Sequence, residues 1–225
     1  MHAKQTIEQI NFLKQFVSEN RIKRFDDVIS QRSNYLQIVL ENLYQAHNAS
    51  AVLRSCESFG LQTVHFIENK NSLKISADVA MGSSNWLTIR RHKESDNNTV
   101  KALTELKKQG FRIVATTPHT NAYTIDTLPV NHKMALVFGT EIDGISSDVY
   151  ELADDFVKIP MYGFTESFNI SVCAALCMYE LTTRIRKTVP DYLLNEEERQ
   201  EVYLNWLKTS VDKSNQLLDQ HFQST

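Results

Sequence analysis

The sequence has little cysteine, and its three cysteines form no recognisable set. Cys56, Cys173 and Cys177 are odd in number and contain no C-x-x-C pair, which argues against a disulfide framework and against a zinc site. The seven histidines are scattered without an H-x-x-x-H or mixed Cys/His pattern, so no metal is expected. Cys173 and Cys177 are four residues apart, which places them on one helix face as small core residues.

Long apolar runs are also absent. The longest, at 170–181, is interrupted by Ser171 and Glu180 and falls short of the roughly 18 residues needed to span a bilayer. The first twenty residues spread their charges along a helical pattern and lack the apolar segment of a signal peptide. We therefore expect a cytoplasmic protein without a membrane partner.

The two common phosphate-binding motifs are missing as well. No G-x-G-x-x-G follows the first predicted strand, which argues against a dinucleotide-dependent oxidoreductase. No G-x-x-x-x-G-K-[ST] is present either, which argues against a P-loop nucleotidase.

A basic excess, common in nucleic-acid-binding proteins, is not found. The formal net charge is -3, from 24 Lys and Arg against 27 Asp and Glu. Positive charge instead gathers in three segments, 21–32, 90–93 and 184–187, and could form a basic face despite the acidic total. Each cluster alone also fits an ordinary solvated surface.

What is present is an alternation of short apolar runs with helical stretches, typical of a parallel sheet covered by helices. The runs of strand length are 36–43, 63–67, 111–115, 134–138 and 156–159. Apolar spacing predicts helices over the first thirty residues, over 169–186 and over 195–218. We therefore predict one α/β domain with a mostly parallel sheet, a size that 225 residues suit.

Helix ends are marked by polar residues and glycine. Asn48 and Asn98 are predicted to cap two helices that end near Gly60 and Gly110. The helix at 169–186 is apolar on nearly all sides, which makes it a candidate for a subunit interface.

Two segments place polar residues or glycine where predicted strands end, which is where α/β proteins build their sites. Segment 47–56 puts Asn48 at a helix start and Arg54 nearly two turns further along. Segment 138–146 runs from a strand into Gly139, Glu141 and a second glycine, and Gly139 would let a ligand approach the backbone. Taken alone, the first also fits a capped helix with an exposed arginine, and the second fits a plain tight turn.

A third segment, 159–171, leaves its strand at Pro160 and leads into the apolar helix. Pro160 limits backbone pairing, so the following amides are available to a ligand. Ser167 and Asn169 stand just before the helix and also fit a simple N-cap pair.

Together and in this order, the three segments resemble the three motifs of the TrmH branch of the SPOUT methyltransferases. The N-x-x-A-x-x-R pattern at 48–54 is similar to the first motif, and Phe-Gly-Thr-Glu at 138–141 with Gly144 is similar to the second. Ile-Pro-Met at 159–161 with Ser-Phe-Asn at 167–169 is similar to the third. The resemblance runs from about residue 24 to residue 187.

The resemblance implies a parallel sheet whose C-terminal part forms a deep trefoil knot, flanked by helices. It implies a helical extension at 1–30, a SPOUT methyltransferase domain at 31–188 and a helical extension at 189–225. The implied activity is methyl transfer from S-adenosyl-L-methionine to a ribose 2'-hydroxyl of RNA, most closely the D-loop guanosine at position 18 of tRNA, by a homodimer.

The resemblance also implies site residues. The backbone around five residues would hold the methyl donor: Thr116, Gly139, Ile159, Met161 and Phe168. Five others would carry or position the chemistry: Asn48, Arg54, Glu141, Ser167 and Asn169.

Arg54 matches the residue that assists loss of the 2'-hydroxyl proton, either as a base or through the neighbouring phosphate. An arginine is normally a fixed cation, so we favour a phosphate clamp. Asn48 and Asn169 would orient Arg54, Glu141 would fix the arginine or the ribose, and Ser167 would line the pocket.

Three alternatives remain open at this point. A ribosomal RNA ribose methyltransferase would share the chemistry, and a non-catalytic RNA-binding module would share the fold. A small-molecule α/β enzyme would need neither the basic segments nor a dimer. Phe168 stands where many relatives carry leucine, and segment 196–201 is acidic where a tRNA-binding extension would be basic, so extra RNA contact is expected at 21–32.

Overall fold

The computed structural model describes residues 2–70, 82–118 and 122–223. They form two compact units, one of residues 33–192 and the other of residues 1–32 together with 193–225. Within these ranges no helix combines the length and the apolar character needed to cross a membrane.

The larger unit is built on a parallel sheet that has seven strands among the described residues. They are β1 (Leu36–Glu41), β2 (Thr63–Ile67), β3 (Thr88–His92), β4 (Arg112–Thr116), β5 (Tyr123–Thr124), β6 (Met134–Phe138) and β7 (Asp155–Lys158). Their order is β3-β2-β1-β6-β4-β7-β5, and each neighbouring pair is parallel. The predicted α/β fold with a mostly parallel sheet is confirmed.

The central strands explain why these segments were recognisable. β1, β2 and β6 are buried along their whole length, and a strand covered on both faces is mainly apolar. The buried polar residues Gln37 of β1 and His65 of β2 are hydrogen-bonded to each other. Five predicted strands are present within two residues, whereas β3 and β5 were not among the predicted runs. β3 has no buried residue and β5 has only two residues, so neither leaves an apolar run.

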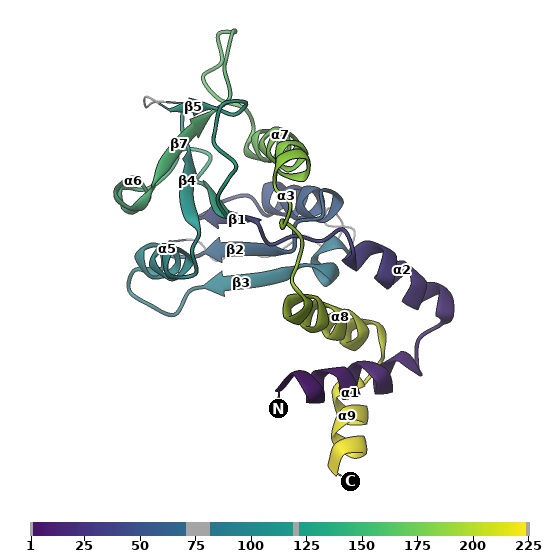
Figure 1. Cartoon of the computed structure of the whole chain (residues 1–225). Coiled ribbons are helices and arrows are strands. Elements are labelled where there is room, and N and C mark those ends of the chain that lie inside the picture. The colour runs from purple at the N-terminus through teal and green to yellow at the C-terminus, as the bar shows by residue number, and fades with distance from the viewer. Residues whose placement is uncertain (1, 71–81, 119–121, 224–225) are drawn as a thin grey trace. The chain divides into compact units, whose positions relative to one another are not determined.

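Helices cover both faces of this sheet (Figure 1). On one face lie α3 (Ala46–Ser58) and α7 (Ile170–Thr188), and on the other lie α5 (Asn98–Lys108) and α6 (Ser147–Leu152). Leu53, Leu136 and Leu181 belong to the buried cluster on the first face, and Leu103 and Val137 belong to the cluster on the second. A short 3-10 helix (Ser83–Trp86) precedes β3.

Two predicted helix caps are wrong. α3 begins before Asn48, which lies inside the first turn and directs its side chain to another segment. The cap of α5 is Asn97, whose side chain accepts a hydrogen bond from the amide three residues on, while Asn98 makes a different bond. Ser146 and Asn169 do cap α6 and α7.

The smaller unit is helical and joins the two ends of the chain. It contains α1 (His2–Lys14), α2 (Glu19–Ile29), α8 (Glu196–Ser210) and α9 (Ser214–Gln223), and α8 contacts the other three. The Phe25 ring lies 5.9 Å from the Tyr203 ring and 5.4 Å from the Trp206 ring. The two expected extensions therefore pack together as one unit.

Two expectations about this unit need correction. The helix predicted at 195–218 is two helices, because the chain turns between α8 and α9 with Lys213 at a φ of 53°. Arg32 is only 1% exposed and lies over the Trp206 ring, so it is not placed for the RNA contact expected of 21–32. Arg21, Lys23 and Arg24 are exposed.

Candidate functional site

The C-terminal ends of β4, β6 and β7 meet the amino-terminal ends of α3 and α7 at a cleft of about 510 Å³ in the larger unit. The cleft is lined by every predicted site residue except Arg54. These are Asn48, Thr116, Gly139, Glu141, Ile159, Met161, Ser167, Phe168 and Asn169. The three motif segments, far apart in the sequence, therefore share one cavity.

Asn48 ties the three segments together. Its Nδ2 donates to Oε1 of Gln45 at 3.1 Å and to Oε1 of Glu141 at 3.0 Å, and its Oδ1 accepts from Nδ2 of Asn169 at 3.2 Å. Asn48 is 3% exposed, so both of its amide hydrogens are used in a nearly dry position. Its orientation is therefore set by three different parts of the chain.

The other two members of this polar cluster are also held. Oε2 of Glu141 accepts from the backbone amide of Tyr44 at 3.3 Å. Oδ1 of Asn169 accepts from the amide of Ser171 at 2.9 Å and from its hydroxyl at 2.6 Å, which leaves Nδ2 for Asn48. Helix capping and site geometry are thus performed by the same side chain.

Arg54 is not brought to the cleft within one chain. It is exposed on α3, and its guanidinium forms no hydrogen bond or ion pair with another described residue. Six residues of helix rotate Arg54 by about 240° from Asn48, which turns it to another side of α3. Asn48, Glu141 and Asn169 therefore hold one another, without Arg54.

Position 139 requires glycine because another part of the backbone lies against it. A Cβ on Gly139 would collide with the backbone of Gly144, which approaches because Thr140 and Gly144 exchange backbone hydrogen bonds of 2.8 and 3.1 Å. The alternative of a tight turn therefore accounts for the missing side chain of Gly139, whose backbone still lines the cleft.

The charged lining of the cleft is mostly acidic. Among the residues that the structure describes, the charged side chains in the lining are Glu141, Asp143, Glu166 and Lys158. The potential in such a cleft favours a cationic ligand and disfavours a phosphate unless further positive charge is supplied.

The wall formed by α7 is neutral. Cys173 and Cys177 line the cleft as free thiols. The hydrogen bond with Cys173 and burial both raise the pKa of the Cys177 thiol, so it stays protonated. Among the described residues no three His, Cys, Asp or Glu side chains gather in a way that could hold a metal ion.

Sequence reasoning missed several lining residues. Gln45 stands three residues before Asn48, a spacing that places both on one helix turn and could have signalled it. Asp143 and Glu166 lie in loops, where acidic residues are too common to be informative.

A second polar cluster, around Glu41 at the end of β1, was also missed. Glu41 is 1% exposed, and its Oε1 accepts from the Thr99 hydroxyl at 2.6 Å and from the Ser146 hydroxyl at 2.7 Å. Its Oε2 accepts from the Ser146 amide at 3.1 Å. Glu41 therefore joins the starts of α5 and α6 to the sheet.

Known proteins resemble this chain in both sequence and structure. The SpoU rRNA Methylase family matches residues 35–179, a range that contains every predicted site residue. A tRNA (guanosine(18)-2'-O)-methyltransferase of Borreliella burgdorferi is 42% identical over 205 residues, covering 91% of this chain and 92% of that protein. A protein of the same name from Aquifex aeolicus is 32% identical over 206 residues, covering 89% and 95%.

Solved structures give the same picture of the fold. The A. aeolicus TrmH/SpoU tRNA modifying enzyme matches with a TM-score of 0.76 and 31% identity, covering 87% of this chain and 98% of that one. The methyltransferase AviRb from Streptomyces viridochromogenes, in complex with the cofactor AdoMet, matches with a TM-score of 0.60 and 20% identity, covering 72% and 64%.

Proposed function

The chain belongs to the SpoU rRNA Methylase family, and from this premise we propose that it transfers a methyl group from S-adenosyl-L-methionine to the 2'-hydroxyl of the guanosine at position 18 in the tRNA D-loop. Relatives of that name match about nine-tenths of the chain. The observation that carries the proposal is the junction at Asn48, which joins all three motif segments around one cleft. The predicted family resemblance is confirmed.

The cleft suits the methyl donor in size and charge. Its volume of about 510 Å³ lies within the roughly 300–1,000 Å³ typical of small-molecule sites. When bound, S-adenosyl-L-methionine supplies a methyl group on a cationic sulfur, and the acidic lining favours such a cation. We propose that the backbone around five residues holds it: Thr116, Gly139, Ile159, Met161 and Phe168.

The chain's own part in the reaction is mainly positioning. A 2'-oxygen must approach the methyl group in line, and a fixed approach lowers the barrier without added chemistry. Glu141 is held by Asn48 and by the Tyr44 amide, so it can orient the ribose hydroxyl beside the donor. Ser167 lines the same cleft and Asn169 fixes Asn48, so both support that geometry.

We propose that the chain forms a homodimer, in which the cleft of one subunit receives Arg54 from the other. Val172, Leu176 and Tyr179 on α7 are 46%, 42% and 61% exposed, and their spacing of four and three residues puts them on one face. Pairing through this face would cover the apolar stripe and would bring the partner subunit's Arg54 to the cleft. There it would clamp the phosphate beside the target ribose and stabilise the developing oxyanion.

We also propose the C-terminal trefoil knot. β6 lies between β1 and β4 although β4 and β5 precede it in the chain, an order that a threaded chain would produce. Stretching single denatured molecules tests this, because a knot shortens the extended chain. We propose a cytoplasmic location as well, because the proposed substrate is tRNA.

The central experiment is methyl transfer to unmodified bulk tRNA from labelled S-adenosyl-L-methionine, with the methylated ribose mapped by nuclease digestion and mass spectrometry. We expect one methylated D-loop guanosine, and no product on a transcript with adenosine in its place. Methyl transfer to ribosomal RNA but not to tRNA would show that the substrate is ribosomal RNA. Absence of donor binding would refute the methyltransferase proposal.

Light scattering at micromolar concentration tests the dimer. We expect a dimer for the wild type and a monomer for Leu176→Glu. The matched control is Val100→Glu, which adds the same charge at a residue 39% exposed on α5, across the sheet, and should stay dimeric. A monomeric wild type would contradict the proposal.

A further inference from the structure

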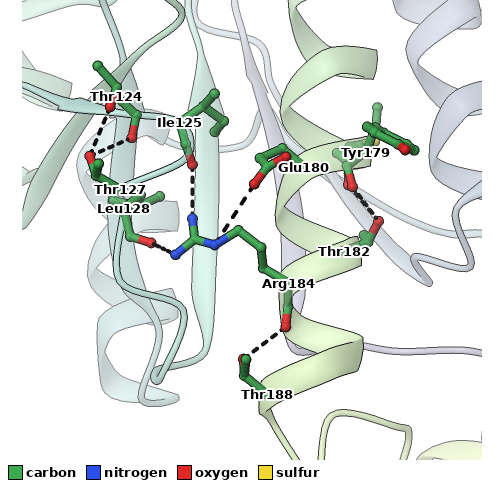
Figure 2. Close-up of polar contacts among 10 residues, drawn as sticks. Thr124, Ile125, Thr127, Leu128, Tyr179, Glu180, Thr182, Arg184 and Thr188 are labelled. Atoms are coloured by element: carbon green, nitrogen blue, oxygen red, sulfur yellow. Dashed lines mark hydrogen bonds and ion pairs between the residues drawn. The ribbon is translucent and has the colours of Figure 1, made fainter.

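Arg184 joins α7 to the turn that follows β5. Its Nη1 donates to the carbonyl of Ile125 at 3.0 Å and its Nη2 donates to the carbonyl of Leu128 at 2.7 Å (Figure 2). On its own helix, Nε lies 4.0 Å from Oε1 of Glu180, and the Thr188 hydroxyl donates to the Arg184 carbonyl at 2.8 Å. The side chain is 25% exposed, so the contact is largely shielded from water.

The turn that Arg184 holds is also bonded to β7, which forms part of the cleft wall. β5 pairs with β7, with Tyr123 opposite Val157 and Thr124 opposite Lys158. The Ile125 amide then donates to the Lys158 carbonyl at 3.0 Å. Val157 and Lys158 line the cleft. Ile125 therefore connects Arg184 to the cleft lining, because its carbonyl accepts from Arg184 and its amide donates to Lys158.

The other end of the connection also reaches the cleft. α7 begins beside Asn169 and places Cys173 and Cys177 in another wall of the cleft. Arg184 therefore links the helix that forms one wall to the strand that forms the other, at a site away from the cleft itself. It does not line the cleft.

The contact requires the shape of a guanidinium. Two N–H groups of one planar fork reach two carbonyls three residues apart, and an ammonium on a flexible stem offers no such preformed pair. The turn is itself ordered by the Thr127 hydroxyl, which bonds the Thr124 carbonyl at 3.0 Å, so the two acceptors are presented together.

Resting on the proposed function, we infer that Arg184 is a positioning residue for the methyl donor. It sets the separation of the two cleft walls by holding the 124–128 turn against α7, and it touches neither donor nor RNA. Although Arg184 lies in the basic segment 184–187, its guanidinium bonds backbone carbonyls of its own chain.

Arg184→Gln and Arg184→Lys test this inference in the full-length protein. Donor dissociation constants are measured by calorimetry without RNA, and KM and kcat are measured with tRNA. Loss of two hydrogen bonds should raise the donor Kd and the donor KM by about tenfold in Arg184→Gln, with kcat at saturating donor and the KM for tRNA unchanged. Arg184→Lys should fall between this variant and the wild type.

The matched control is Arg186→Gln on the same helix. The Arg186 guanidinium donates to the Phe59 carbonyl at 3.1 Å, beyond the far end of α3 from the cleft. It should lower the thermal midpoint slightly without changing donor affinity. If Arg184→Gln does not fold, Thr127→Ala loosens the same turn and should weaken donor binding by a smaller factor.

Two results would overturn the inference. Donor affinity unchanged in Arg184→Gln and Thr127→Ala would reduce the contact to a structural one, and a raised KM for tRNA with unchanged donor affinity would make Arg184 an RNA contact. A wild type that fails to bind the donor would instead refute the proposed function.

Discussion

Two carboxylates follow neighbouring strands of the sheet and serve different ends. Glu41, at the end of β1, is 1% exposed and accepts three hydrogen bonds from Thr99 and Ser146. Glu141, beyond β6, is partly exposed, accepts one side-chain bond from Asn48 and lines the cleft. The first is enclosed by its own chain, whereas the second keeps part of its surface for another molecule.

The difference teaches that residue type and strand-end position do not identify a site. What separates the clusters is how many acceptor positions the protein itself fills, and whether a cavity adjoins the rest. Substitutions at the Glu41 cluster should therefore affect folding, and substitutions at the Glu141 cluster should affect methyl transfer.

The largest effect is expected at Arg54, which would complete the Glu141 cluster from another subunit. Arg54→Lys should lower kcat by about 100-fold, because a lysine cannot give the same forked contact to a phosphate. Donor affinity, measured by calorimetry, should stay within twofold of the wild type. An equal loss of donor affinity would show that Arg54 belongs to the donor pocket.

Mixed dimers sharpen this test. Arg54→Lys and Asn169→Ala subunits refolded together should give about 30% of wild-type turnover, against about 10% for the same two variants kept as separate homodimers, because half of the dimers are mixed and each has one intact composite site. No recovery on mixing would mean that Arg54 serves its own cleft.

The two carboxylates can be compared directly by the same substitution. Glu41→Gln should lower the free energy of unfolding by about 2 kcal/mol, because the new amide sets a donor against a hydroxyl or amide donor in a buried position. Glu141→Gln should lower turnover by about tenfold and leave stability almost unchanged. Urea unfolding and kinetics on both variants check this, and a stability loss confined to Glu141→Gln would reverse the assignment.

A buried histidine extends the comparison to pH. His65 is 4% exposed, with Nδ1 2.9 Å from Nε2 of His92 and Nε2 2.8 Å from Oε1 of Gln37. Burial, with the charges of His92 and Arg90, lowers the pKa of His65 to about 3. Like Glu41, this cluster is satisfied by the chain itself.

The lowered pKa gives the pH dependence a definite sign. Between about pH 6.5 and pH 3 the unfolded chain binds a proton that the folded chain does not, so the stabilisation is complete above pH 6.5 and declines on acidification, by up to about 1.4 kcal/mol per pH unit. His65→Gln should flatten this slope in urea unfolding between pH 7.5 and pH 5. The exposed His132→Gln should keep it, and an unchanged slope in His65→Gln would assign the acid sensitivity elsewhere.

The smallest effect separates capping from site geometry at one residue. Asn169 and Asn195 both cap helices with their side chains, at the starts of α7 and α8. Alanine at either position should lower stability by about 1 kcal/mol. Only Asn169→Ala should also lower methyl transfer, by about fivefold, because only Asn169 bonds Asn48. Equal activity losses would indicate a general effect of destabilisation.

The sheet was predictable because its central strands are buried on both faces and are therefore mainly apolar. Cap positions were less predictable, because adjacent polar residues such as Asn97 and Asn98 compete and only the backbone dihedral angles decide which one caps. The break between α8 and α9 was not predicted, because no glycine or proline lies between the two helices.

The site was predictable in part. Motif residues such as Asn48 and Asn169 gather at one cleft, but that they bond each other depends on packing that no spacing encodes. The sequence left two reasons open for Gly139, a tight turn and ligand approach, because the group that approaches it is the backbone five residues on. The buried position of Arg32 was missed because its partner, Trp206, is remote in the sequence.

The pairing of the first helices with α8 has a consequence for synthesis. α1 and α2 are made before α8, the helix that covers them, which follows about 165 residues later, a delay of roughly 10–30 s at about 5–20 residues per second. During that interval Leu13, Phe25 and Ile29, which are buried in the finished protein, lack their final cover. α1 and α2 are thus covered only after the whole larger unit has been made, and until then they are exposed to chaperones that bind apolar helices.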